Sequence, residues 1–338
     1  MVEQKKIIES LIQLADTFSR DNEKLQAAIT RTYEENNWLT QDNYNLALNN
    51  WKEQLTTQNL TNFCSSYSYD ANPKNVGIIM AGNIPMVGFH DVLCVLLSGN
   101  NAVIKTSSDD KYVIPYLLEE LIQIAPNLKS RITFVDRIQE IDAVIATGSN
   151  NTFRYFQHYF KDIPHLLRKN RKSMAILSGT ETDKELDLLG DDVFQYFGLG
   201  CRNVSLLALP DSLDITRVLD HFMQYTHLEN HNKFANNYTY HRAILLMNNE
   251  QHLDTGFVLA KERKELNAPL SCFNYFTYAN QEELDIFIKN NQENIQCIVG
   301  KYSNVDTVDY GQSQKPNIQD FADNVDSMKF LNSLHKTS

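Results

Sequence analysis

The sequence has no apolar run long enough to cross a membrane. Its longest runs, such as Val92–Leu97, are far shorter than the roughly 20 residues that a transmembrane helix needs. The first residues, Met1–Lys6, lead into an amphipathic stretch and contain no apolar core of a signal peptide. We therefore expect a cytoplasmic protein with no membrane span.

Cysteine is sparse, and its spacing is wrong for a crosslinked or zinc-binding framework. The five cysteines are Cys64, Cys94, Cys201, Cys272 and Cys297. They are odd in number and widely spaced, and no two form a C-x-x-C pair. This pattern favours reduced thiols in a cytosol over disulfides or a structural zinc site.

Basic residues are outnumbered, with 31 Lys and Arg against 42 Asp and Glu and a net charge of −11. A general nucleic-acid binder needs a basic face, so that class of function is disfavoured. An anionic dinucleotide is still allowed, because a few local cations and helix N-termini can hold its phosphates. The Gly-x-Gly-x-x-Gly fingerprint of an orthodox Rossmann site is absent.

What is present indicates a globular protein of two or three domains. The chain has 338 residues, 42% of them hydrophobic, and its 17 Phe and 16 Tyr can fill large cores. We find no internal repeat. Up to about residue 60, apolar residues recur at helical spacing, which predicts a helical lead-in.

From residue 75 onward, short apolar strands alternate with helices. In the first half we predict strands at 76–80, 101–105, 132–135 and 143–146, and helices at 90–98 and 112–124. In the second half we predict strands at 173–177 and 204–209, helices at 186–196, 213–225 and 282–289, and further apolar segments at 243–247, 273–277 and 295–299. This alternation predicts two parallel, doubly wound α/β units.

Gly198–Asn203 is the sharpest local motif. Two glycines before Cys201 let the backbone approach a ligand or adopt positive φ, and the cysteine falls between a helix and a strand. Such a cysteine can be presented into a cleft as a nucleophile. The alternative is a buried cysteine that acts as a small hydrophobic residue.

Three further motifs follow predicted strands. Asn83 lies in a Gly-Asn-Ile-Pro turn, where its amide can face a developing oxyanion or simply serve the turn. Lys105–Ser108 lies at the carboxyl end of a strand, where α/β sheets bind ligands, or is a solvated loop. Thr147–Asn150 can place N–H groups under a pyrophosphate or be a plain helix cap.

A metal site has little support. His227 and His231 have the His-x3-His spacing that places two rings on one helix face, with Glu229 between them. No third ligand stands at a convincing distance, and the segment is rich in asparagine. We therefore predict a polar surface or cleft segment and no metal.

The order of these motifs resembles that of the aldehyde dehydrogenase superfamily, and within it the LuxC-like acyl-CoA (fatty acyl) reductases. The resemblance runs from about Trp38 to Phe330. It is carried by Asn37–Thr40, Val76–Lys105, Ala146–Ser149, Gly200–Val204, Asn236–Tyr238, Tyr310–Gln314 and Asp323–Phe330. It implies an aldehyde dehydrogenase-like fold, with two Rossmann-like α/β domains and an N-terminal helical region.

The same resemblance implies the chemistry of three positions. Cys201 would be the nucleophile that forms an acyl-enzyme. Asn83 and the backbone N–H of Cys201 would form the oxyanion hole. Glu265 would hold the nicotinamide ribose, although Ala268 replaces a glycine of that motif.

Cofactor residues are implied in the same way. Lys105 would bind the adenosine ribose, and Gly148 and Ser149 would lie near the pyrophosphate. Oxidising NAD enzymes often carry a Glu three residues after the lysine, and Ser108 stands there in this sequence. A hydroxyl does not repel a 2′-phosphate, so we predict NADP as the cofactor.

A second departure concerns the direction of the reaction. Oxidising members carry a carboxylic acid that activates water, and its position falls at Arg168 when Lys172-Ser173 is aligned with their Lys-Ser pair. No carboxylate lies between Pro164 and Ile176, so water attack on an acyl-enzyme would be slow.

These features together predict an NADPH-dependent reductase that makes a fatty aldehyde from an acyl thioester. Two alternatives are an aldehyde oxidiser of the same fold and a non-catalytic relative that acts as a binding or assembly subunit. We expect acyl-CoA or an acyl-carrier thioester as partner, with an acyl-transferring protein as a further candidate, in a homo-oligomer. The expected organisation is a helical region at 1–73, an NADP-binding domain at 74–196, a catalytic domain at 197–303, and a C-terminal tail at 304–338 that serves as a packing or oligomerisation arm.

Overall fold

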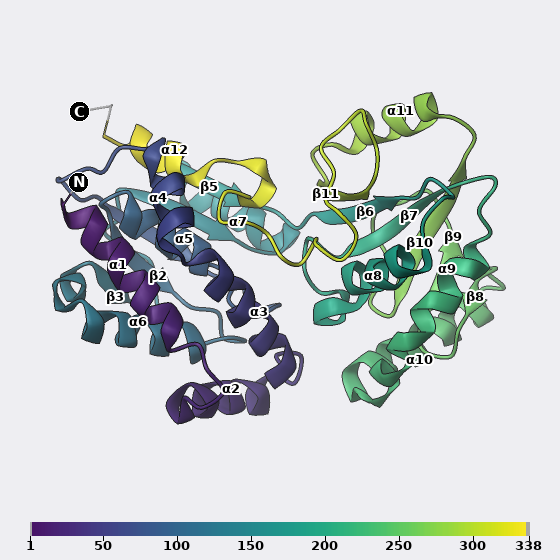
Figure 1. Cartoon of the computed structure of the whole chain (residues 1–338), viewed down its shortest axis with the longest axis horizontal. Coiled ribbons are helices and arrows are strands. Elements are labelled where there is room, and N and C mark those ends of the chain that lie inside the picture. Colours follow the sequence, from purple (N-terminus) through teal and green to yellow (C-terminus); the bar gives the residue numbers. More distant parts are fainter. Residues whose placement is uncertain (1, 336–338) are drawn as a thin grey trace. The chain divides into compact units, whose positions relative to one another are not determined.

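The computed structural model describes residues 2–335, which belong to two compact units (Figure 1). The first unit joins Met1–Asn170 to Asn317–Ser338, and the second is Arg171–Pro316. The sequence predicts a boundary after residue 196, whereas the structure divides after Asn170. The reason is that β6 (Lys172–Ile176) pairs with β7 and β11 of the second sheet, so the chain leaves the first unit before this strand.

Four helices open the first unit, as the apolar spacing predicts. They are α1 (Val2–Asp16), α2 (Glu23–Glu35), α3 (Gln41–Gln54) and α4 (Thr57–Ser65). The side chains of Asn22, Thr40 and Thr56 cap α2, α3 and α4 by accepting a backbone N–H of the first turn. The buried faces of these helices share one hydrophobic core with the first sheet.

The first sheet has five parallel strands in the order β3-β2-β1-β4-β5. The strands are β1 (Asn75–Ile79), β2 (Asn101–Lys105), β3 (Ile132–Phe134), β4 (Ala143–Thr147) and β5 (His165–Arg168). The connecting segments hold α5 (Phe89–Leu97), α6 (Val113–Ile124), η1 (Pro126–Ser130) and α7 (Asn150–Tyr159). The four strands predicted before residue 150 are confirmed, and β5 is an addition.

The chain returns to the first unit after Pro316. It forms η4 (Ala322–Asn324) and α12 (Ser327–Ser333), and α12 packs on α5. The side chain of Asn332 exchanges hydrogen bonds with the backbone of Ser68, which ties this segment to the loop after α4.

The second sheet has six strands in the order β11-β6-β7-β10-β9-β8. Besides β6 they are β7 (Val204–Pro210), β8 (Leu253–Asp254), β9 (Leu259–Glu262), β10 (Cys272–Tyr278) and β11 (Ile295–Gly300). All neighbours are parallel except the short edge strand β8, which runs antiparallel to β9.

Helices cover both faces of the second sheet (Figure 1). On one face, α11 (Gln281–Asn291) buries Leu284, Phe287 and Ile288 against alternate residues of β6, β7 and β10. The other face carries α8 (Asp183–Phe194), α9 (Ile215–Phe222), η3 (Met223–Asn230) and α10 (Asn232–Met247). Phe194, Phe222 and Phe257 form ring contacts beneath these helices.

One sequence prediction in this unit is wrong. The apolar segment 243–247 was grouped with the strands, but it is the last part of α10. The polar residues before it, which gave no periodic apolar signal, supply the first three turns of that helix. Among the described residues, no helix combines the length and the apolar character that a membrane crossing requires.

Candidate active site

Cys201 lies in a turn with unusual backbone geometry. After α8 the chain enters η2 (Gln195–Gly198), in which Tyr196 has φ 52° and ψ 28° and Phe197 has φ 58° and ψ 22°. Gly198 follows at φ 77°. Left-handed conformations cost a non-glycine residue about 1–2 kcal/mol each, so the surrounding structure must hold this turn in place.

Asn203 is the residue that holds the turn. Its side chain is buried; Nδ2 donates to Gln195 O at 2.6 Å, and Oδ1 accepts from Gly200 N at 2.8 Å. Asn203 N also donates to Gly200 O at 3.3 Å, which closes a β-turn around Cys201 and Arg202. The nucleophile candidate is therefore fixed from both sides at the second position of a tight turn.

Strand residues support the same turn from beneath. Ser173 Oγ donates to Cys201 O at 3.0 Å and lies 3.1 Å from Cys297 Sγ. Because Cys201 precedes β7, while Ser173 and Cys297 lie near the starts of β6 and β11, the site stands at the amino-terminal edge of the second sheet.

The motif 310–314 forms a brace for the turn. Arg202 Nε donates to Ser313 O at 2.7 Å. The fully buried carboxylate of Asp192, on α8, accepts Gly311 N at 2.6 Å and Ser313 N at 2.9 Å. This motif is part of the family resemblance, which implies no role for it. In the structure the motif links α8 to the nucleophile turn.

Three of the other four cysteines are disfavoured as nucleophiles. Burial raises the pKa of Cys64 to about 11 and that of Cys272 to about 12. Burial also raises the pKa of Cys94 well above its usual value. Because the thiolate is the reactive form, these three residues remain protonated near neutral pH. Cys201 is only half-buried.

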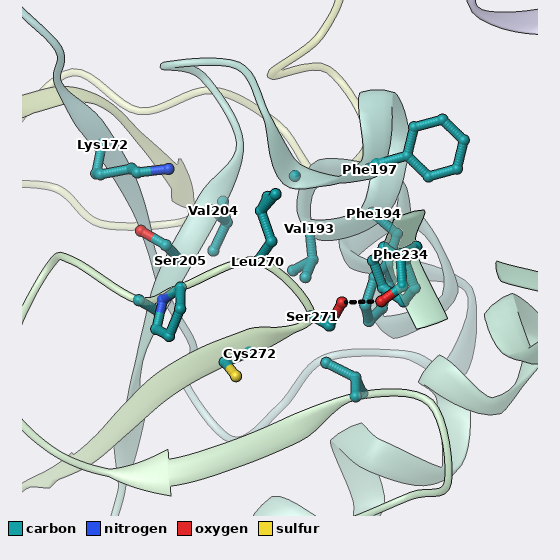
Figure 2. Close-up of a pocket in the computed structure, with 14 residues that line it drawn as sticks. Lys172, Val193, Phe194, Phe197, Val204, Ser205, Phe234, Leu270, Ser271 and Cys272 are labelled. Atoms are coloured by element: carbon teal, nitrogen blue, oxygen red, sulfur yellow. Dashed lines mark hydrogen bonds between the residues drawn. The ribbon is translucent and has the colours of Figure 1, made fainter. Parts of the chain in front are cut away.

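A small pocket, part of it open to solvent, lies beside the nucleophile turn (Figure 2). Most of the residues that line it are apolar, among them Phe194, Phe197, Phe234 and Leu270, and Gly198 lines it as well. Lys172 is the one cation among the residues that line it. An apolar cavity with few polar groups is typical of a small-molecule site.

The candidate residues of the first unit gather at one sheet edge. Ile79 at the end of β1 pairs with Lys105 of β2 and with Ala146 of β4. The loops after these three neighbouring strands carry Asn83, Ser108 and Gly148 at the carboxyl edge of the sheet. This is the edge at which open α/β sheets bind ligands.

Ser107 and Ser108 occupy different environments. Ser107 packs under the Asn83 turn, where a Cβ on Gly82 would lie 2.5 Å from Ser107 Oγ. Ser108 is exposed, as is Asn83, and Lys105 is half-buried. A substituent at position 108 therefore has room that position 107 lacks.

Ser149 is the N-cap of α7. Its Oγ accepts Thr152 N at 3.3 Å and lies 2.9 Å from Thr152 Oγ1. A Cβ on Gly148 would lie 3.0 Å from both Thr152 and Phe156, so the chain passes close over its own helix. The helix-cap interpretation holds for Ser149, and a phosphate can still be bound by the amino end of α7.

Glu265 is exposed on the segment after β9, and Arg263 Nη1 lies 3.6 Å from its carboxylate. The structure places Glu265 in the second unit with Cys201, and Asn83, Lys105, Ser108, Gly148 and Ser149 in the first. The same segment continues into Ala268 and Pro269, which line the pocket.

Arg168, at the position of the missing acid, has a structural role. It ends β5 and is buried, with Nη1 2.6 Å and Nη2 2.9 Å from the two oxygens of Asp91 on α5. Nη2 also donates to Ser327 Oγ of α12 at 2.8 Å. The guanidinium therefore connects strand, helix and returning tail inside the first unit.

The histidine segment is used for capping and stacking. His231 accepts Phe234 N at the start of α10, and its ring lies 4.2 Å from that of Phe197. Among the described residues, no group of three or more His, Cys, Asp or Glu is placed to hold a metal ion.

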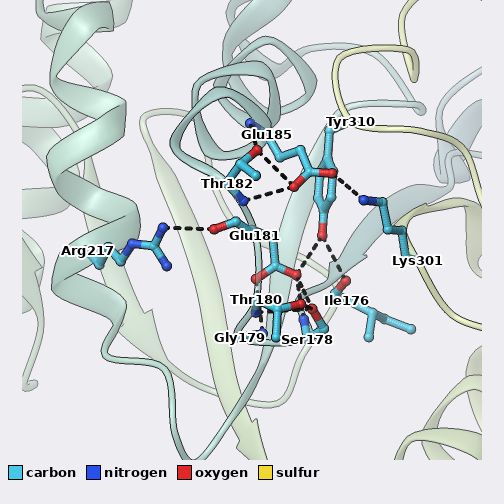
Figure 3. Close-up of polar contacts among 10 residues, drawn as sticks. All are labelled: Ile176, Ser178, Gly179, Thr180, Glu181, Thr182, Glu185, Arg217, Lys301 and Tyr310. Carbon is cyan, nitrogen blue, oxygen red and sulfur yellow. Dashed lines mark hydrogen bonds and ion pairs between the residues drawn. The ribbon is translucent and has the colours of Figure 1, made fainter.

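The opposite edge of the second sheet is closed by a polar network (Figure 3). The buried carboxylate of Glu181 accepts Ser178 N at 2.6 Å, Gly179 N at 3.0 Å and Tyr310 Oη at 3.1 Å. These bonds satisfy backbone N–H groups of the loop after β6.

Sequence reasoning did not assign roles to Asn203, Lys172 or Asp192. Asn203 and Lys172 stand inside quoted motifs, so their positions were visible. Their functions were not, because the local hydrogen bonds of Asn203 and the place of Lys172 in a pocket appear only in the folded chain. Asp192 gave no signal, since its partners lie more than 100 residues away in the chain.

Comparisons with known proteins show the family and the fold of the chain. The family model described as acyl-CoA reductase (LuxC) matches residues 7–216, more than half of the chain and inclusive of Cys201. A long-chain acyl-protein thioester reductase from Aliivibrio fischeri is 29% identical over 35% of this chain, and the match spans only 27% of that protein.

Solved structures share the fold. A putative aldehyde dehydrogenase from Burkholderia cenocepacia superposes with a TM-score of 0.66 at 12% identity, over 89% of this chain and 75% of that one. An aldehyde dehydrogenase from Bacillus cereus, solved as an NAD⁺ complex, gives 0.63 at 13% identity, over 90% and 73%. The predicted aldehyde dehydrogenase-like fold is confirmed, and the chain belongs to the acyl-CoA reductase (LuxC) family.

Proposed function

We propose that the protein is an NADPH-dependent reductase that converts a fatty acyl thioester to an aldehyde through an acyl–Cys201 intermediate. The observation that carries the proposal is the clamped turn, which holds half-buried Cys201 in place at the amino-terminal edge of the second sheet. The family to which the chain belongs supports the acyl thioester as substrate class.

In the proposed mechanism the Cys201 thiolate attacks the thioester carbonyl, and the carrier thiol leaves. The backbone N–H of Cys201 would donate to the oxyanion, and the family resemblance implies the amide of Asn83 as the second donor. NADPH supplies a hydride equivalent when bound. The resulting thiohemiacetal on Cys201 then collapses to free aldehyde and regenerates the thiolate.

The first unit has residues that fit a dinucleotide. The Lys105 ammonium and the Ser108 hydroxyl would hold the adenosine ribose and its phosphate. The amino end of α7, at Gly148 and Ser149, would hold the pyrophosphate. The close approach of the Gly82 turn to Ser107 keeps this edge compact while leaving Ser108 exposed. In the second unit, Glu265 would hold the nicotinamide ribose.

The absence of a carboxylate from 164–176 favours reduction over hydrolysis. Arg168 cannot replace it as a base, because it is a cation committed to Asp91. An acyl-enzyme would therefore wait for the reductant and would not be lost to water.

The test is to incubate the whole protein with radiolabelled acyl-CoA in the absence of NADPH and to map the label by peptide digestion. We expect label on Cys201, and its release as aldehyde when NADPH is added. Cys201→Ser is the variant, and Cys297→Ser, at the neighbouring strand, is the matched control that should keep the label. Release as fatty acid would indicate an aldehyde oxidiser, and label on Cys297 with Cys201 untouched would overturn the assignment.

A further inference from the structure

Lys172 stands out because it is a cation in an apolar pocket. It begins β6 and lines the pocket across from Phe197, and its ammonium is directed into that space (Figure 2). With the described residues, its side chain forms no ion pair and no hydrogen bond. Most buried ammonium groups are paired, so an unpaired one needs an explanation.

The position of Lys172 is tied to that of Cys201. Ser173, the next residue, donates its hydroxyl to Cys201 O at 3.0 Å, so the start of β6 and the nucleophile turn are in direct contact. Lys172 N donates to Asn294 O at 3.0 Å, which anchors the backbone on its other side. The backbone of the lysine is therefore anchored beside the turn that carries Cys201.

Among the residues that line the pocket, Lys172 is the one cation, and Cys272 is the other ionisable group. The neighbour of Cys201, Arg202, donates its Nε to Ser313 O, and Arg168 is paired with Asp91 in the first unit.

We infer that the Lys172 ammonium is the counter-ion of the Cys201 thiolate, and that it activates the nucleophile in place of a general base. A thiolate beside a fixed cation is favoured over the neutral thiol by Coulomb attraction, which is strengthened by the apolar walls. The inference rests on Cys201 being the nucleophile of the proposed function.

The electrostatics of the pair are consistent with this role. Burial lowers the pKa of Lys172, and charge on Cys201 acts in the opposite direction. Each ion therefore favours the charged form of the other. When the thiolate is consumed by acylation, the ammonium loses its partner, so its proton becomes easier to release during the acyl-enzyme stage.

The experiment measures the reactivity of Cys201 without any substrate. The full chain is treated with iodoacetamide from pH 5 to 10, and alkylation of Cys201 is followed by peptide mass spectrometry. In the wild type we expect a midpoint below the usual thiol value of about 8.5. Lys172→Met should raise the midpoint by about one unit and slow alkylation at pH 7 by roughly tenfold. Lys172→Arg should restore most of the rate.

Lys184→Met is the matched control, because it removes the same charge from an exposed site on α8. It should leave the midpoint unchanged. If Lys172→Met is folded by circular dichroism and keeps the wild-type midpoint, the inference is overturned. If Lys172→Met is unfolded, the midpoints of the wild type and of Lys172→Arg decide: both below about 8.5 support the inference, and ordinary values overturn it. If the alkylation midpoint depends on Lys172 but acyl-CoA leaves no label on Cys201, the ion pair is upheld and the proposed reaction is rejected. If Cys201 is labelled but its midpoint is that of an ordinary thiol, the proposed reaction is upheld and the ion pair is rejected.

Discussion

The two units use opposite edges of their sheets. In the first unit the candidate residues follow β1, β2 and β4, at the carboxyl edge where helix amino ends and loops face a ligand. In the second unit Cys201 precedes β7, and Lys172 begins β6, at the amino edge. A general rule of α/β sheets therefore locates one site, while the other depends on a locally built turn.

Because of this difference, we expect substitutions at the two sites to have different effects. The loops of the first unit are exposed at Asn83 and Ser108, so changes there should alter binding and rate more than folding. The nucleophile turn contains two non-glycine residues with positive φ and is held by a buried asparagine. Changes there should affect stability and reactivity together.

The largest effect is expected from breaking the clamp with Asn203→Ala. The change removes the donor to Gln195 O and leaves Gly200 N without its acceptor, so the free energy of unfolding should fall by about 2–4 kcal/mol. Denaturant unfolding measures it. Asn236→Ala, at an exposed helix position of the same unit, is the control and should change stability by less than about 0.5 kcal/mol. Equal losses in the two variants would show that the clamp is dispensable.

In the first unit, Asn83→Ala should lower turnover by on the order of a hundredfold, with little change in NADPH affinity or stability. The reason is that Asn83 is exposed and its proposed role is to donate to the oxyanion. Steady-state NADPH oxidation with acyl-CoA measures the rate. Asn72→Ala, an exposed asparagine of the same unit, should be neutral. A normal rate for Asn83→Ala would remove this residue from the mechanism.

A smaller effect is expected at the cofactor edge. Ser108→Glu should weaken NADPH binding by about tenfold and affect NADH less, because a carboxylate repels the 2′-phosphate. Ser130→Glu adds the same charge just before β3, at the opposite edge of the sheet, and should change neither affinity. Dissociation constants of both cofactors decide the matter. Equal losses for NADPH and NADH would mean that position 108 does not read the phosphate.

The smallest effect is expected in the pH dependence of the free energy of unfolding, to which one buried carboxyl group in each unit contributes. Burial raises the pKa of Asp192 in the second unit to about 6, and outweighs its bonds from Gly311 and Ser313. Burial likewise raises the pKa of Asp110 in the first unit to about 6. A carboxyl group with a raised folded-state pKa stabilises the fold below its unfolded value and loses that contribution as pH rises through about 6.

Asp192→Asn and Asp110→Asn should each reduce the stability that the protein loses as the pH rises through about 6. Between pH 4 and 6 the slope of unfolding free energy against pH should flatten by at most about 1.4 kcal/mol per pH unit for each variant. Thermal unfolding across this range measures the slope. An exposed control, Asp211→Asn, should keep the wild-type slope. Wild-type slopes in both buried variants would contradict the raised pKa values.

The contrast between the units also explains what the sequence could reveal. The strands of the first unit are short buried runs between turn residues, so 101–105 was located to the residue and 132–135 to within one. The helix α10 was missed because its polar first turns carry no apolar stripe, and because its N-cap is a histidine, which is not one of the usual capping residues. Cys201 was recognised from its glycine context. The clamp of Asn203 was not, because its local bonds to Gln195 and Gly200 have no signature in the sequence. The contacts of Asp192 were not, because they join segments more than 100 residues apart.

The returning tail makes the second unit an insertion within the first. Residues 171–316 are continuous and can fold as soon as they have been synthesised, whereas the first unit needs α12, made much later, to complete its contacts with α5 and Arg168. During synthesis the first unit must therefore persist with one face of α5 uncovered. Closing a loop of this length is entropically cheap if the inserted unit is already compact, because loop cost grows only with the logarithm of length. The order of translation, and not only the native contacts, thus determines when the buried ion pair of Asp91 and Arg168 becomes sealed from water.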